Sequence, residues 1–313
     1  MRTALYIVGG IALTALLGWG ALQVAVDRNG PAVLDTIDRI AGGERAATLV
    51  ERASTGPHAQ QKVLVWSPPG ADRGTAPLPV IVFVHGGSWR DGDPDDYGFV
   101  ARALVPEGFV VVLAGYRLGE AGRYPAMLED TAAAIRWTRE NIAAHGGDPE
   151  AIVLAGHSAG AYNVVTTALD TRWLEAEGVP PQSIAGVVGI AGPYDFLPFD
   201  SESTIAAFGH VDDPEQTQPV SHVGEDAPQM LLIHGEEDET VEPRNTRALT
   251  DRLEKAGGHA LPLFFPGMSH SDPLIALAAP WRSRRSVLEY VAGYAHAVTS
   301  KGETSFPVQG ETR

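Results

Sequence analysis

Short runs of β-branched and aliphatic residues alternate along the chain with longer stretches of helical amphipathic spacing. The runs are bounded by Gly, Pro or polar turn residues, which predicts strands at 61–66, 80–84, 109–113, 151–155, 184–190, 230–233 and 261–265. Apolar residues at helical spacing predict helices at 97–106, 125–145, 161–169, 243–256 and 280–298. Strands that alternate with helices indicate an α/β fold, a mostly parallel central sheet flanked by helices.

The N-terminal pattern differs, because residues 4–26 carry no charge and only Thr14 and Gln23 are clearly polar. As a helix this stretch would span ~34 Å, enough to cross a bilayer. We therefore expect residues 1–26 to form a transmembrane anchor or a signal segment; a buried helix is the third alternative. An anchor would make the membrane a partner and place the rest of the chain on the periplasmic or extracellular side. Cleavage would make the protein secreted.

Residues 27–55 are expected to form a helical tether of two short amphipathic pieces, separated by the glycine pair at 42–43. Residues 56–299 then contain the predicted sheet and helices. Within them, residues 195–227 are expected to form a small cap insertion, which holds eight acidic residues and no Lys or Arg. Residues 300–313 are expected to be a flexible tail.

Composition excludes several kinds of chemistry and partner. The 313 residues have a formal net charge of −16 and no cysteine. Thiolate catalysis, disulfides and zinc-thiolate sites are thereby excluded. The acidic balance, with no basic stretch, argues against a nucleic-acid partner. The sequence contains no metal-ligand or nucleotide-binding signature, so we expect no cofactor and no metal. It does not indicate an oligomeric state.

The clearest motif is Gly-His-Ser-Ala-Gly at 156–160, which lies between the predicted strand 151–155 and the predicted helix 161–169. A tight turn between strand and helix lifts the Ser158 hydroxyl above the edge of the sheet. A side chain at either glycine would collide with the neighbouring strand or helix. The helix N-terminus at this point favours developing negative charge.

Polar residues also follow three other predicted strands. His85-Gly-Gly-Ser-Trp89 follows the strand at 80–84, Asp238 follows the strand at 230–233, and His270 follows the strand at 261–265. Functional groups in a parallel sheet collect beyond the carboxyl ends of its strands. We therefore expect these groups and Ser158 to lie together.

Together these four motifs resemble the α/β-hydrolase fold, and more narrowly its H-G-G-x-W esterase branch. That branch includes feruloyl-esterase-like and hormone-sensitive-lipase-like carboxylesterases and kynurenine formamidases. The resemblance runs from about residue 56 to residue 298. The chain departs from it in the N-terminal apolar span and at Gly115, where relatives usually carry asparagine.

The resemblance implies a catalytic triad of Ser158, Asp238 and His270, in the order along the chain that this fold uses. Asp238 has three acidic rivals in its own loop, namely Glu236, Glu237 and Glu239. The oxyanion hole would be formed by the backbone N–H groups of Gly87, Ser88 and Ala159.

Two further residues are expected at the substrate. Trp89 either lines the acyl pocket or anchors its loop by packing. His157 is a substrate-binding candidate by position, although its ring, like those of His85 and His234, can instead bond to backbone groups. Arg117 and Asp130 are expected to form a structural ion pair behind the site.

These residues predict a serine hydrolase that cleaves small carboxylic esters through an acyl-enzyme on Ser158. One alternative is an arylformamidase, because residues 85–92 and 97–101 are similar to that family's stretch. An alternative of another class is an inactive, membrane-tethered binding protein on a hydrolase scaffold. The retention of the serine, the histidine and the oxyanion glycines argues against this last alternative.

Overall fold

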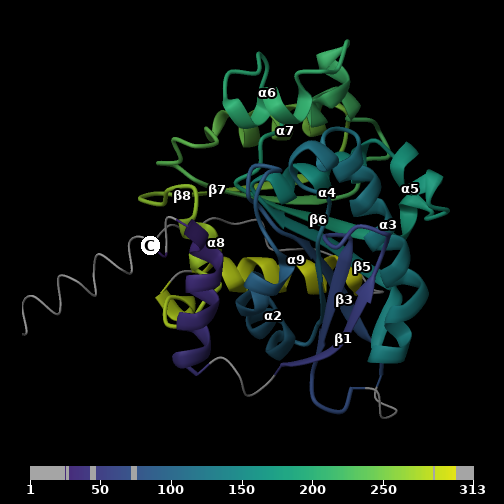
Figure 1. The fold of residues 1–313 in the computed structure, drawn as a ribbon, viewed down its shortest axis with the longest axis vertical. Helices are drawn as coiled ribbons and strands as arrows, with labels where there is room; N and C mark the ends of the chain where they lie inside the picture. Colours follow the sequence, from purple (N-terminus) through teal and green to yellow (C-terminus); the bar gives the residue numbers. More distant parts are fainter. Residues whose placement is uncertain (1–24, 26–27, 43–46, 72–75, 285, 301–313) are drawn as a thin grey trace, which may run out of the picture.

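The fold is built on one eight-stranded sheet (Figure 1). The computed structural model describes residues 25, 28–42, 47–71, 76–284 and 286–300. The strand order is β1-β2-β4-β3-β5-β6-β7-β8. The pairs β1–β2 and β2–β4 are antiparallel, and from β4 to β8 every pair is parallel. The expected fold, a mostly parallel sheet flanked by helices with a small cap insertion, is confirmed.

The strands are β1 (Thr48–Ser54), β2 (Lys62–Ser67), β3 (Leu78–Val84), β4 (Val110–Ala114), β5 (Gly147–His157), β6 (Ile184–Ile190), β7 (Met230–Gly235) and β8 (Ala260–Phe265). The labelled helices are α2 (Gly98–Leu104), α3 (Ala126–Asn141), α4 (Ala159–Leu169), α5 (Arg172–Ala176), α6 (Glu202–Phe208), α7 (Arg244–Lys255), α8 (Asp272–Ile275) and α9 (Val287–Thr299). Residues 28–40 form one more helix.

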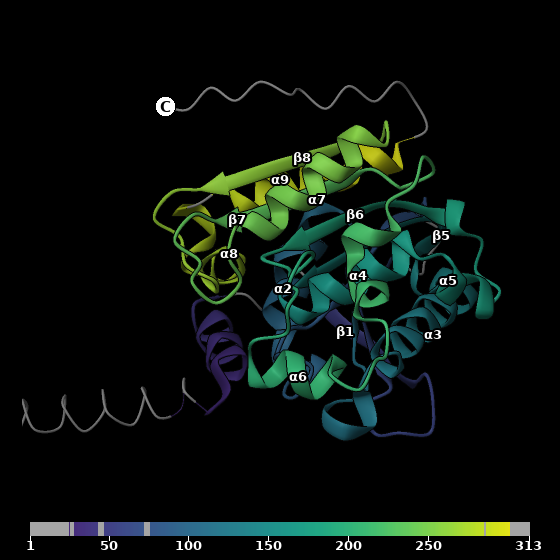
Figure 2. The same cartoon turned by 90° about the horizontal axis from the view of Figure 1, so that it is seen from above.

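Two hydrophobic cores lie on opposite faces of the sheet, because successive strand residues point to opposite sides. In β3, Val80, Val82 and Val84 pack into the core shared with α3, α4 and α7. Ile81 and Phe83 pack into the core shared with α2, α8 and α9. Figures 1 and 2 show these two helical layers on either side of the strands. The central strands are therefore buried on both faces, which explains their continuous apolar runs.

The expected helical tether over residues 27–55 is wrong in its second half. Thr48–Ser54 is strand β1, which pairs antiparallel with β2 at the edge of the sheet. Its residues alternate between exposed and partly buried, the period-2 pattern of an edge strand. Pairing with β2 satisfies the backbone N–H and C=O groups along one edge of β1. These hydrogen bonds outweigh the weak helical preference that the spacing of a few apolar residues indicates.

The first half of the predicted tether is a helix, but it is fixed to the domain by buried ion pairs. Asp38 Oδ2 accepts from Arg102 Nε of α2 at 2.6 Å, and neither side chain is more than 3% exposed. Asp38 Oδ1 accepts from the backbone N–H of Ala279 at 2.7 Å and from Arg282 at 3.1 Å. Asp35 provides a second carboxylate, which forms an ion pair with Arg102. One buried carboxylate thus joins residues 28–40 to α2 and to the segment after α8.

The expected closing helix from residue 280 is also too long. Helix α9 begins at Val287, and Arg282–Arg284 form a 3₁₀ turn. In this segment Arg282 donates to the carbonyl of Leu277 and to Asp38. These side-chain bonds tie Arg282 to the segment just after α8 and to the helix at 28–40.

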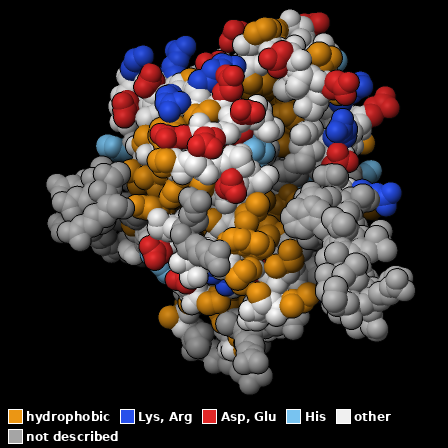
Figure 3. All heavy atoms as spheres, turned by 90° about the vertical axis from the view of Figure 1, so that its left-hand side faces the viewer, with side chains coloured by type: hydrophobic (Ala, Val, Ile, Leu, Met, Phe, Trp, Pro, Cys, Tyr) orange, Lys and Arg blue, Asp and Glu red, His pale blue; other side chains and the backbone are white. Residues whose placement is uncertain are grey.

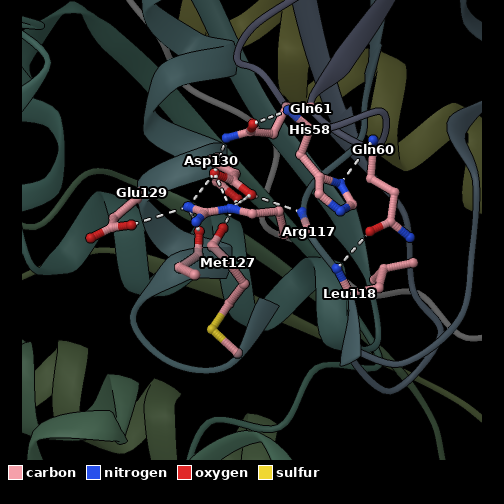
Figure 4. Close-up of polar contacts among 10 residues, drawn as sticks. His58, Gln60, Gln61, Arg117, Leu118, Met127, Glu129 and Asp130 are labelled. Carbon is pink, nitrogen blue, oxygen red and sulfur yellow. Dashed lines mark hydrogen bonds and ion pairs between the residues drawn. The ribbon is translucent and has the colours of Figure 1, made fainter. Parts of the chain in front are cut away.

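The expected ion pair between Arg117 and Asp130 is present and holds the loop after β4 (Figure 4). Asp130, buried on α3, accepts from Arg117 Nη2 at 2.7 Å and from the Arg117 backbone N–H at 2.7 Å. Gln61 Nε2 donates to the same carboxylate at 2.7 Å. The Asp130 carboxylate on α3 thereby joins the loop after β4 to the residue just before β2.

The expected anchor or signal segment at residues 1–26 lies outside the described residues, apart from residue 25, and so does most of the expected tail at 300–313. Among the described residues, no helix has the length and apolar character to cross a membrane.

Replacing Asp38 tests whether the first helix belongs to the folded domain. Asp38→Ala should lower the free energy of unfolding by about 3 kcal/mol, because it leaves Arg102 with only Asp35 and removes the acceptor of the Ala279 N–H. Glu150→Ala, which breaks an exposed pair with Arg139, should cost at most about 1 kcal/mol. Urea unfolding followed by fluorescence measures both. Equal effects would show that residues 28–40 are not an integral part of the domain.

Candidate active site

Ser158 occupies a strained turn between β5 and α4. Its backbone has φ 54° and ψ −121°, a region that non-glycine residues rarely adopt. The turn is held by hydrogen bonds from the Ser158 N–H to Ile190 O at 2.8 Å and from the Tyr162 N–H to Ser158 O at 3.1 Å. Helix α4 is buried along its whole length. This packing keeps the hydroxyl at the carboxyl end of the sheet.

The glycines of the motif are required by close approach of the backbone. A Cβ atom at Gly156 would lie 2.4 Å from the backbone of Gly160, and one at Gly160 would lie 2.1 Å from the carbonyl of Val84. Real Cβ atoms are not found at such distances. The first turn of α4 therefore packs directly against the end of β3, which brings Ser158 beside the loop that follows that strand.

The structure brings Ser158, His270 and Asp238 into one hydrogen-bonded series. His270 Nε2 lies 2.9 Å from Ser158 Oγ, and His270 Nδ1 lies 2.7 Å from Asp238 Oδ2. Ser158 follows β5, Asp238 follows β7 and His270 follows β8. The parallel register of these strands delivers the three loops to one edge of the sheet.

Asp238 is distinguished from its rivals by burial and by its hydrogen bonds. Its side chain is fully buried, whereas Glu236, Glu237 and Glu239 are exposed. Oδ1 accepts from the backbone N–H groups of Thr240 and Val241, each at 2.9 Å. Burial alone would raise the pKa of Asp238, but the hydrogen bonds from His234, His270 and Val241 outweigh it and hold that pKa well below its usual range. The carboxylate is therefore ionised and can stabilise a charged imidazole.

The loop after β3 presents backbone N–H groups beside Ser158. Gly87 and Ser88 have φ 122° and 55°. A Cβ at Gly87 would lie 1.9 Å from the carbonyl of Asp91, so only glycine fits there. Within the described part of the chain, the N–H groups of Gly87, Ser88 and Ala159 donate to no protein acceptor. Such donors next to a serine, one of them at the N-terminus of α4, can bind a developing oxyanion.

His157 contacts the triad rather than open solvent. Burial lowers the pKa of His157 to about 3, so its ring is neutral. The ring Nε2 lies 3.1 Å from the backbone carbonyl of His270, to which it donates. Burial likewise lowers the pKa of His85 to about 4, and its Nδ1 bonds to the carbonyl of Gly86. Both rings therefore fix backbone segments of the site, and His157 holds the loop that carries His270.

Trp89 is packed between α4 and the cap insertion. Its indole lies edge-on to Tyr162 and to Phe208, with ring centroids 5.3 and 4.8 Å away. Its Nε1 donates to Asn163 Oδ1 at 3.1 Å. Trp89 also lines a cavity of about 340 Å³ beside Ser158, together with Phe196 and polar residues of the insertion. The indole thus packs against the cap, and Trp89 also contributes to the lining of this cavity.

A second cavity at Ser158 was not predicted from the sequence. This cavity, of about 410 Å³, is lined on one side by the helix at 28–40 and on the other by the segment 271–281. The only available signal was the apolar spacing of Val33, Leu34 and Ile37. That spacing indicates a buried helix face but does not reveal which surface the face meets.

The strand-turn-helix serine and its histidine and aspartate, at the carboxyl edge of a parallel sheet, define an α/β-hydrolase. The model of the family named BD-FAE matches residues 69–253. The chain belongs to this family.

Curated relatives carry esterase names. Esterase LipQ of Mycobacterium tuberculosis is 30% identical over 251 residues, which are 73% of this chain and 58% of LipQ. Carboxylesterase NlhH of the same organism is 49% identical over 84 residues, 26% of each chain. Isoprenylcysteine alpha-carbonyl methylesterase ICME of Arabidopsis thaliana is 27% identical over 252 residues, 72% of this chain and 58% of ICME. The chain therefore spans little more than half the length of LipQ or ICME.

Solved structures show the same fold. Esterase B from Lactobacillus rhamnosus, at 20% identity, aligns with a TM-score of 0.69 over 92% of this chain and 95% of its own. A carbohydrate esterase from gut microbiota, also at 20% identity, aligns with a TM-score of 0.69 over 82% of this chain and 97% of its own. At these identities the likeness is one of fold.

We expect His157 to act as a positioning residue. His157→Phe keeps a ring of similar shape but loses the N–H that bonds to His270 O, so kcat should fall on the order of tenfold through displacement of the base. His157→Gln, whose amide can donate to the same carbonyl, should recover most of that loss. Steady-state kinetics on a short ester, with circular dichroism as the folding control, measures this. Equal activity of both variants would contradict a positioning role.

Asp238 should be the only acidic residue of its loop that matters for turnover. Asp238→Asn should lower kcat on the order of 10²–10⁴-fold, because the amide no longer stabilises the charged imidazole or fixes its tautomer. Glu237→Gln, one position earlier and exposed, is the matched control and should change kcat by less than about twofold. A larger loss of kcat in Glu237→Gln than in Asp238→Asn would show that Glu237, not Asp238, orients the imidazole.

Proposed function

We propose that the chain hydrolyses carboxylic esters through an acyl-enzyme on Ser158. The observation that carries the proposal is the series Ser158–His270–Asp238, with contacts of 2.9 and 2.7 Å, next to N–H groups that have no acceptor in the described part of the chain. A serine hydroxyl is a weak nucleophile unless a base takes its proton, and the base works only when a third group orients it. The nucleophile, the base and the orienting group meet at one point of the sheet.

In the first step Ser158 Oγ attacks the ester carbonyl carbon while His270 Nε2 accepts the hydroxyl proton. The carbonyl oxygen becomes an anion that the N–H groups of Gly87, Ser88 and Ala159 stabilise. Asp238, already ionised, stabilises the imidazolium. When the carbon–oxygen bond to the alcohol breaks, His270 gives the proton to the departing oxygen.

In the second step water enters at the place that the alcohol leaves. His270 accepts a proton from this water, which attacks the acyl carbon and forms a second tetrahedral anion at the same N–H groups. Cleavage of the bond to Ser158 Oγ then releases the carboxylic acid, and His270 returns the proton to the serine. The names of LipQ, NlhH and ICME, all esterases, support this reaction class.

The nucleophile assignment predicts a large and specific loss. Ser158→Ala should lower kcat at least about 10³-fold on p-nitrophenyl acetate and abolish labelling by a fluorophosphonate probe, because the covalent route is gone. More than a tenth of wild-type activity in a folded variant would overturn the assignment.

The same panel should include N-formylkynurenine. A higher kcat/KM on that amide than on the ester would identify an arylformamidase.

We further propose that the protein is anchored in a membrane by residues 4–26, with the catalytic domain on the periplasmic or extracellular side. The support is the uncharged stretch itself, which is long enough to cross a bilayer. The described helix at 28–40 follows this stretch in the sequence and is fixed to the domain through Asp38. Such an anchor would hold the active site close to the membrane surface.

The anchor predicts different partitioning of two forms of the protein. The full chain should stay with membranes after a high-salt wash, since salt releases electrostatically held proteins but not a spanning helix. A form that starts at residue 27, which keeps the helix at 28–40, should be soluble and equally active on a short ester. Mass spectrometry of the N-terminus separates an anchor from a cleaved signal. A full chain that is soluble with residues 4–26 still attached would contradict the proposal.

A further inference from the structure

Two cavities of different character meet at Ser158. The cavity under the cap is polar: Asp200, Glu239, Glu242 and Arg244 line it, together with hydroxyl groups of the insertion. The other has no Asp, Glu, Lys or Arg among the described residues of its lining. Both cavities are lined by Ser88, Ser158 and Thr240. A molecule that reacts at Ser158 can therefore extend into both.

The second cavity has apolar walls on two sides. Val33, Leu34 and Ile37 of the helix at 28–40 form one wall, and Leu274, Ile275 and Trp281 contribute to the opposite one. Figure 3 faces this side of the molecule and shows hydrophobic side chains gathered on it. The volume of about 410 Å³ lies within the range of small-ligand sites, roughly 300–1,000 Å³.

Buried polar contacts fix the two walls to each other. Asp38, one residue after Ile37, accepts from the Ala279 N–H and from Arg282, both in the segment that follows α8. Both walls also lie outside residues 69–253, the part of the chain that the family model matches. The two apolar walls are thus fixed to each other and belong to segments that the family match does not cover.

The position of His270 decides which half of an ester each cavity can take. In the proposed reaction His270 gives its proton to the alcohol oxygen, so the alcohol must lie on the side of the imidazole. His270 lines the apolar cavity and is not among the described residues that line the polar one. The acyl group, on the other side of the carbonyl carbon, is then directed toward Ala159, Trp89 and the cap.

We propose that the apolar cavity is the alcohol site, and that the substrates are esters of a hydrocarbon alcohol with a short acyl group. This inference rests on the proposed function and adds the substrate class. Each methylene that enters an apolar site can raise kcat/KM by up to about fourfold. Methylenes added to the acyl group would meet the polar cavity and give no such gain in kcat/KM.

Two series of esters test the assignment with the full chain. From ethyl to hexyl acetate, kcat/KM should rise at least about 30-fold, and from ethyl acetate to ethyl hexanoate it should stay level or fall. A rise in the acyl series with a flat alcohol series would overturn the assignment. So would the absence of chain-length dependence in both. If no ester at all is turned over, the proposed function fails, and this inference with it.

Two residues on one helix give a matched pair of variants. Ile37→Trp fills the cavity and should lower the ratio of kcat/KM for hexyl acetate to that for ethyl acetate at least about fivefold. Ile40→Trp, three residues further on and 82% exposed, should leave this ratio unchanged. Ile275→Trp fills the cavity from the opposite wall and should lower the ratio in the same way. The test therefore still stands if one of the two filling variants folds poorly. Equal ratios in wild type and in both filling variants would overturn the proposal.

Discussion

The close packing of the first turn of α4 against the end of β3 determines the rest of the site. Gly156 and Gly160 allow the backbones to approach to distances that no side chain tolerates, and Ser158 is held at φ 54° as a result. Strain of this kind persists only where the surrounding structure enforces it. Here the fully buried α4 and the bond from the Ser158 N–H to Ile190 O supply that enforcement. The hydroxyl therefore meets His270 without local rearrangement.

The groups around the serine are arranged through backbone contacts as much as through side chains. His157 bonds to the carbonyl of His270, His85 bonds to the carbonyl of Gly86, and Asp238 accepts two backbone N–H groups. Each of these bonds fixes a loop that follows a different strand. The rigid sheet and these loop contacts together pre-organise the site, so little reorganisation is needed when charge develops on the substrate.

The alternation of strands and helices and the meeting of the motif loops could be predicted, because they depend on local patterns: continuous apolar runs, turn glycines and the strand-turn-helix around Ser158. The structure of the N-terminal region could not be predicted in this way. Thr48–Ser54 is expected to be helical, yet it is an edge strand stabilised by pairing with β2, in which Thr48 pairs with Ser67 and Ser54 with Lys62. The apolar cavity depends on Asp38 meeting Arg102 and Arg282. Contacts at such separations leave no periodic signal, so neither the docking of the helix nor the cavity was accessible to sequence reasoning.

Covalent acylation of Ser158 is the central claim, and trapping the acyl-enzyme tests it most directly. Wild-type protein mixed with p-nitrophenyl acetate and quenched in acid should gain the mass of one acetyl group, located by peptide mapping on Ser158. The release of p-nitrophenol should show a burst close to one equivalent of enzyme when deacylation is the slower step. Turnover of the ester with the acetyl group on another residue, or with a burst that persists in Ser158→Ala, would contradict the account.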